Sequence, residues 1–138
     1  MDQGTVSLMP DERELRLVLT VKDFDEALLF YRDALGFEVE AEWPSDNGRV
    51  VLLSAGRATI ELVDEGQAAE IDRIEVGRRV AGPVRLAIEV EDSAALAEAL
   101  EAAGAARLGG PVTTPWNDRN VRLEAPDGTQ LTLFTPTE

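Results

Sequence analysis

The chain has no histidine and no cysteine among its 138 residues. The lack of cysteine excludes disulfides, zinc–thiolate sites and thiol nucleophiles. The lack of histidine removes the usual general base near neutral pH and the commonest metal ligand. A serine–histidine–aspartate triad and the common zinc sites are therefore impossible. What remains for chemistry is acid–base work by carboxylates, or binding of a hard cation by carboxylates.

Basic residues are scarce, since 13 Lys+Arg stand against 27 Asp+Glu and the net charge is -14. Such a surface repels nucleic acid and anionic membranes. No apolar run approaches the roughly 18 residues of a membrane span, and the polar start of the chain does not resemble a secretion signal. We expect a cytoplasmic protein with no nucleic-acid or membrane partner. Its charge serves solubility or attracts a cationic ligand.

An internal repeat organises the sequence. Residues 15–23 (LRLVLTVKD) match residues 84–92 (VRLAIEVED), and both alternate as strands with one buried face do. Each segment leads into a helical pattern, over 24–35 in the first copy and 93–103 in the second. Asp23 is the predicted cap of the first helix, and Asp92 or Ser93 that of the second.

The repeat continues past the helices. Residues 49–63 match residues 120–134, and a glycine-bearing turn in each copy joins two alternating segments, as in a β-hairpin. We expect Val50 and Leu52 to face the first helix together with Leu17. Residues 37–43 supply one more strand in the first copy, and 106–118 are the counterpart in the second.

These patterns predict an α+β fold made of paired βαβββ modules. The modules form a curved mixed sheet around a cleft, with helices on the outer face. The predicted organisation is one domain: an N-terminal extension over 1–12, a first module over 13–63, a linker over 64–83 and a second module over 84–135.

The segments VKDFDEALLFYRDALGFEV and PWNDRNVRLEAPDGTQLTLF resemble the vicinal oxygen chelate superfamily, the glyoxalase, bleomycin-resistance and dioxygenase group. The resemblance covers about residues 13–135. It implies the paired βαβββ fold, but it leaves the function open because this fold hosts lyases, isomerases, dioxygenases, thiol transferases and drug-binding proteins. In the enzymes of the group, four side chains of the cleft hold one divalent metal, typically His or Gln, Glu, His and Glu.

Matching the motifs places those four metal-ligand positions at Arg16, Glu61, Arg85 and Thr132. Only Glu61 is a common ligand type. Guanidinium groups stay protonated and repel a dication, and one carboxylate with one hydroxyl is too few oxygens for a hard cation. The resemblance therefore implies a member with no metal and no other cofactor.

Strand alternation places Arg16, Arg85 and Arg122 on the cleft face, together with Glu61 and Thr132. In one interpretation Arg16, Glu61 and Arg85 form a closed ion-pair network with Glu61 as the shared acceptor, because partly buried charges need partners. In the other, an arginine is left to bind a carboxylate or another anion. We favour the network.

Trp43 and Trp116 are the only tryptophans, and both fall near segments that line the predicted cleft. Each is either a stacking platform for a planar ligand or a cap on the core or on a dimer seam. The PWND segment resembles the ligand loop of drug-binding members. Asn117, Arg119 and Asn120 then offer hydrogen bonds at the cleft mouth.

Three functions remain from the sequence. The first is a metal-independent protein that binds a small molecule in a dimer cleft, for example to sequester an antibiotic or a related metabolite. The second is an enzyme of the same superfamily, a lyase, isomerase or dioxygenase, in which a carboxylate such as Glu61 acts as the base. The third is a structural or regulatory module whose cleft is vestigial. We favour the first, and we expect a homodimer because strand edges are left uncovered.

Overall fold

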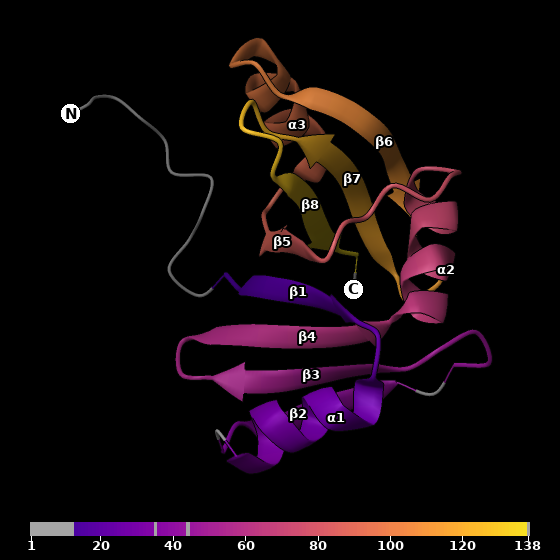
Figure 1. Ribbon diagram of the computed structural model, residues 1–138. Helices are drawn as coiled ribbons and strands as arrows, with labels where there is room; N and C mark the ends of the chain where they lie inside the picture. The colour runs from indigo at the N-terminus through magenta and orange to yellow at the C-terminus, as the bar shows by residue number, and fades with distance from the viewer. Residues whose placement is uncertain (1–12, 35, 44, 138) are drawn as a thin grey trace.

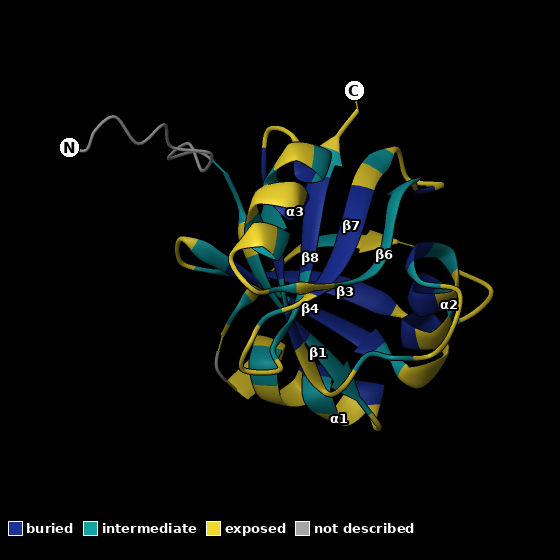
Figure 2. Cartoon of the chain, turned by 90° about the horizontal axis from the view of Figure 1, so that it is seen from above, coloured by how far each residue is buried: buried dark blue, intermediate teal, exposed yellow. Residues whose placement is uncertain are grey.

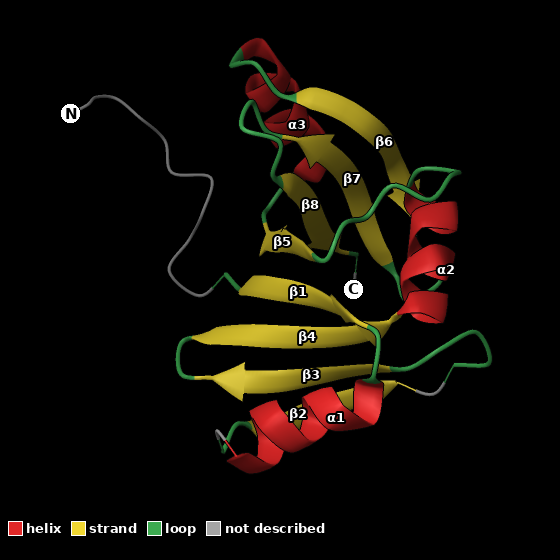
Figure 3. Cartoon of the chain, in the orientation of Figure 1, coloured by secondary structure: helices red, strands yellow, loops and turns green. Residues whose placement is uncertain are grey.

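A computed structural model describes residues 13–34, 36–43 and 45–137. Its 8-stranded sheet has the order β2-β3-β4-β1-β5-β8-β7-β6 (Figures 1 and 3). The predicted N-terminal extension (1–12) and the predicted last helical residue, Leu35, lie outside the described residues. The elements are β1 (Leu15–Val21), α1 (Phe24–Leu28), the π-helical turn η1 (Leu29–Ala34), β2 (Glu38–Trp43), β3 (Val50–Ala55), β4 (Ala58–Asp64), α2 (Glu65–Glu75), β5 (Val84–Glu89), α3 (Ser93–Ala102), β6 (Ala106–Thr113), β7 (Asp118–Glu124) and β8 (Gln130–Pro136).

The two halves of the chain repeat one arrangement. β1 runs parallel to β4 in the first half, and β5 runs parallel to β8 in the second. The halves are joined by the antiparallel pairing of β1 with β5, in which Leu17 stands opposite Leu86. The predicted α+β fold, with βαβββ modules in one curved mixed sheet, is confirmed.

The helices α1 and α3 begin where the capping patterns predicted. The Asp23 carboxylate accepts the N–H of Glu26 at 3.0 Å, and the Asp92 carboxylate accepts the N–H of Ala95 at 3.1 Å. Asp92, not Ser93, is therefore the cap of α3. Each of the two helices shares a core with its own half of the sheet, Phe24 and Leu28 packing with Val51, Leu53 and Leu62, and Ala97 packing with Val90, Val121, Leu123 and Leu133.

The predicted facing of β3 is wrong by one residue. Val51 and Leu53 pack under α1, whereas Val50 belongs to the core on the opposite face of the sheet. The reason is the run Val-Val-Leu-Leu at 50–53, which is buried on both faces. A strand that is apolar on both faces has no alternation from which its phase can be inferred.

The segment between the modules contains α2, a helix that the sequence analysis treated only as part of a linker. The Asp64 carboxylate caps it by accepting the N–H of Gln67 at 2.8 Å. Ala68 and Ile71 pack into the core on the inner face of the sheet, and α2 contacts β1 and β4 of one half and β6 and β7 of the other. Figure 2 shows that one side of α2 is buried. Within the described ranges, no helix is long and apolar enough to cross a membrane.

Candidate functional site

An open cavity of about 540 Å³ lies on the inner face of the sheet, between the central strands and α2. This inner face carries the alternate residues of the strands, those that point away from α1 and α3. Most of the predicted ligand-binding residues border the cavity: Arg16, Trp43, Glu61, Arg85, Trp116, Asn120 and Thr132. A volume of this size lies within the range of roughly 300–1,000 Å³ that is common for small-molecule sites.

Arg16, on β1, is held by two carboxylates. Its guanidinium contacts Glu14 at 2.8 Å and Glu61 at 3.1 Å, and the hydroxyl of Thr59 also donates to Glu14 at 2.7 Å. Burial alone would lower the pKa of Arg16, but the hydrogen bonds and charges of Glu14 and Glu61 outweigh burial and raise it. The Arg16 charge is therefore satisfied within the protein.

Arg85, on β5, has a different environment. Arg85 is 6% exposed, and its guanidinium donates one hydrogen bond, to the Thr132 hydroxyl at 2.8 Å. Among the described residues, no carboxylate lies within ion-pair distance of it. Burial lowers the pKa of Arg85, the nearby charge of Arg122 lowers it further, and Glu75 and Glu61 act in the opposite sense. The predicted network is therefore not formed as expected, because Arg16 is the one cation among the described residues that pairs with Glu61.

The four positions implied for metal ligands do come together. Arg16, Glu61, Arg85 and Thr132 lie on the neighbouring strands β1, β4, β5 and β8 and border one cavity. The Glu61 carboxylate is engaged by Arg16, and the Thr132 hydroxyl by Arg85. In the part of the chain that the structure describes, no group of three or more acidic residues is placed to hold a metal ion. These residues do not fit a divalent cation.

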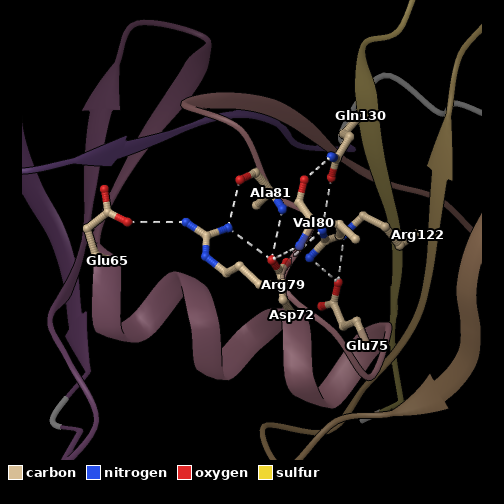
Figure 4. Close-up of polar contacts among 8 residues, drawn as sticks. All are labelled: Glu65, Asp72, Glu75, Arg79, Val80, Ala81, Arg122 and Gln130. Carbon is tan, nitrogen blue, oxygen red and sulfur yellow. Dashed lines mark hydrogen bonds and ion pairs between the residues drawn. The ribbon is translucent and has the colours of Figure 1, made fainter.

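Arg122 was predicted as a cleft residue, but it lies sealed beneath α2. The side chain is 0% exposed and pairs with Asp72 at 2.9 Å and with Glu75 at 3.0 Å. Gln130 accepts a further hydrogen bond from it at 3.1 Å. Figure 4 shows these partners arranged around the guanidinium. Arg122 therefore holds α2 against β7 and does not border the cavity.

Asp72 completes this buried cluster. It accepts the N–H groups of Val80 and Ala81 at 2.7 and 2.8 Å and pairs with Arg79 at 3.0 Å (Figure 4). Burial alone would raise the pKa of Asp72, but these backbone hydrogen bonds and the charge of Arg122 outweigh it and lower the pKa. The cluster fixes the chain that follows α2, and with it the wall of the cavity that α2 forms.

The two tryptophans border the cavity from opposite parts of the chain. Trp43 ends β2 and is 42% exposed, and Trp116 precedes β7 and is 41% exposed. Asn117 and Arg119, predicted at the cleft mouth, do not border this cavity. Asn117 is an exposed turn residue with a φ of 69°, and the exposed Arg119 donates to the Thr113 hydroxyl at 3.3 Å.

Sequence reasoning missed three carboxylates at the cavity, those of Glu70, Glu75 and Asp118. Burial raises the pKa of Asp118, the charge of Arg16 lowers it, and the net shift is upward. Alternation could have found Asp118, because it lies two residues before Asn120 on the same face of β7. Glu75 could have been found only by predicting α2, for which Asp64 followed by Gln67 is a capping signal.

The sequence profile of the Glyoxalase/Bleomycin resistance protein/Dioxygenase superfamily matches residues 15–133. A search of curated proteins found no significant match.

Several solved structures share the fold. Methylmalonyl-CoA epimerase from Mycobacterium tuberculosis superposes with a TM-score of 0.67 at 22% identity, over 99% of this chain and 94% of that one. A hypothetical protein from Bacillus halodurans gives 0.67 at 18% identity, over 91% and 96%. A glyoxalase/bleomycin resistance protein/dioxygenase superfamily member from Vibrio splendidus gives 0.66 at 20% identity, over 89% and 98%. At these identities the likeness is one of fold.

Proposed function

The chain belongs to the glyoxalase/bleomycin resistance protein/dioxygenase superfamily, and we propose that it is a metal-independent small-molecule-binding protein of the bleomycin-resistance-like kind. One observation carries the proposal. At the four positions implied for metal ligands, Arg16 binds Glu61 and Arg85 binds Thr132, and these residues still border a cavity of about 540 Å³. The protein thus has an open cavity whose donor set is unsuited to a metal.

The lining supports an organic ligand. Val50, Ile71, Ala87 and Phe134 supply apolar surface, and the tryptophan rings stand beside polar groups. Such a mixture, mostly apolar with a few placed polar groups, is typical of small-molecule sites. An antibiotic or a related metabolite is the class of ligand that we propose.

A melting-temperature screen tests the proposal. A ligand that binds only the native state raises the melting temperature by mass action. Antibiotics and small metabolites are screened with and without excess EDTA, and we expect at least one to raise the melting temperature equally in both. A shift that appears only without EDTA, and returns with added metal, would contradict metal-independent binding.

We further propose that the protein is a homodimer. β2 and β6 are the edge strands of the sheet, and β2 exposes Val39 and Trp43. Uncovered edges and apolar side chains favour association of two copies. Sedimentation at micromolar concentration is expected to give about twice the 15.0 kDa chain mass. A species of single-chain mass would contradict this proposal.

The enzyme alternative has one observation in its favour, the raised pKa of Asp118 at the cavity. A carboxylic acid with a raised pKa is suited to proton transfer. Small carboxylic acids incubated with the protein in D₂O test it by NMR. Under our proposal, the hydrogens next to the carboxylate do not exchange. Exchange that the Asp118→Asn variant abolishes would favour the enzyme.

A further inference from the structure

We infer that the ligand is a monocarboxylate with a planar apolar body, and that Arg85 binds its carboxylate. The inference rests on the proposed function, because it names the class of molecule that the same cavity takes. It follows from a buried guanidinium at the cavity, that of Arg85, whose hydrogen-bonding capacity the described residues use only in part.

The three arginines of the inner face set Arg85 apart. Arg16 and Arg122 each contact two carboxylates within the protein. Arg85 has five N–H donors, and the described residues accept from one of its nitrogens, the one bonded to Thr132. Arg85 itself borders the cavity, and no described residue accepts from its other guanidinium nitrogens. A buried guanidinium with free donors is suited to binding a carboxylate with two hydrogen bonds.

Asn120 is not a partner for the ligand, although it borders the cavity and is 3% exposed. Its amide nitrogen donates to Glu75 at 2.7 Å. Its amide oxygen is sealed from solvent and has no hydrogen-bond partner among the described residues, so a ligand in the cavity does not reach it. Arg85 therefore carries the recognition.

The charges at the cavity favour a single negative charge on the ligand. Glu61, Glu75 and Asp118 border the same space as Arg85. Arg85 provides one positive charge without an ion-pair partner in the described structure. A phosphate dianion would gain the same contact but would meet twice the repulsion from these carboxylates. A monocarboxylate therefore fits better than a phosphate ester.

The remaining lining sets the shape of the ligand. Trp43 and Trp116 flank the opening, and Ile74 and Phe134 lie along the cavity. Flat apolar rings favour stacking with a planar group. These are also the only two tryptophans of the chain, so their fluorescence reports on occupancy of the cavity.

Binding of matched aromatic probes tests the inference. Benzoate, benzamide, benzylamine and phenyl phosphate share one ring and differ in charge. We expect tryptophan fluorescence to show that benzoate binds at least about tenfold more tightly than the other three, the range for a charge-assisted hydrogen bond.

A variant links the effect to Arg85. Arg85→Met should remove the preference for benzoate over benzamide. Arg57→Met is the matched control, because Arg57 is an exposed residue of the β3–β4 turn away from the cavity. Melting temperatures establish that each variant is folded. A preference for benzoate that survives Arg85→Met would overturn the inference.

The other outcomes separate the inference from the proposed function. If benzylamine or benzamide binds in the cavity and benzoate does not, the carboxylate assignment is wrong and the proposed function stands. If phenyl phosphate binds more tightly than benzoate, the monoanion argument is wrong. If no probe of any charge, and no compound of the melting-temperature screen, binds, both the inference and the proposed function fail.

Discussion

Three arginines on one face of the sheet have three different environments. Arg122 is sealed with Asp72 and Glu75, Arg16 is partly exposed beside Glu61, and Arg85 is buried with a hydroxyl partner. Removing each charge should therefore change the free energy of unfolding by a different amount, although the side chains are chemically identical. A buried charge that loses its partner is strongly destabilising, whereas removal of a buried charge without an ion-pair partner is not.

Arg122→Met is expected to lower the free energy of unfolding by about 3–5 kcal/mol, because it leaves Asp72 and Glu75 buried without their cation. Arg85→Met is expected to be nearly neutral or stabilising in the ligand-free protein, since it removes a buried cation that has no carboxylate partner among the described residues. Urea unfolding of both variants checks the order. An equal loss in the two variants would contradict the assigned roles.

The lowered pKa of Asp72 gives a pH dependence with a definite sign. A carboxylate whose pKa is lower in the folded state stabilises the fold above its unfolded pKa, and this contribution is lost as the pH falls through the folded value. Asp72→Asn should thus cost about 1–3 kcal/mol at pH 7. The difference from the unchanged protein should shrink below about pH 4. Unfolding midpoints between pH 7 and 3 measure it, and a difference that does not vary with pH would contradict this assignment.

Among the elements, α2 is the helix that was not predicted from the sequence. Its buried positions include Gln67, Asp72 and Glu75 as well as Ala68 and Ile71. An apolar stripe is the usual sign of an amphipathic helix, and here charged residues that pair with Arg122 take part of that stripe. β1 and β5 were predictable because they alternate, and the two hairpins because a glycine-bearing turn joins matching segments in both copies. The helices that flank the sheet were predictable because they carry capping residues. The wall of the cavity that α2 forms was thus not predicted, because buried ion pairs hold this helix in place.

β6 and α2 approach each other closely at Gly109. A Cβ at Gly109 would collide with the main chain of Glu75 and Val76. Gly109→Ala should therefore displace α2, lower the free energy of unfolding by about 1–3 kcal/mol and weaken ligand binding. Gly82→Ala is the control, because no atom lies within 4 Å of its added Cβ. Equal unfolding midpoints for the two variants would show that α2 does not depend on this contact.

At the scale of the whole molecule, the pairing of two similar modules was predictable from the repeat. Two copies at nearly constant offset require two similar units, and alternation in each copy gives its strands. Which residues of β3 face α1 could not be predicted, because Val50 to Leu53 are apolar on both faces of the strand. The partners of the cleft arginines were also not predictable, because Glu14 and Glu75 reach Arg16 and Arg122 from segments to which the repeat assigns no contact. The repeat therefore predicts which residues face the cleft but not which charges neutralise each other.

Metal binding by the unmodified protein tests the central claim most directly. EDTA-treated protein is titrated calorimetrically with Zn²⁺, Mn²⁺ and Ni²⁺, and a variant that combines Arg16→His, Arg85→His and Thr132→Glu with the native Glu61 serves as the positive control. We predict no stoichiometric binding by the unmodified protein, because two guanidiniums occupy the metal-ligand positions and Arg16 engages Glu61. Binding of one equivalent by the unmodified protein, abolished by Glu61→Gln, would contradict metal-independent function.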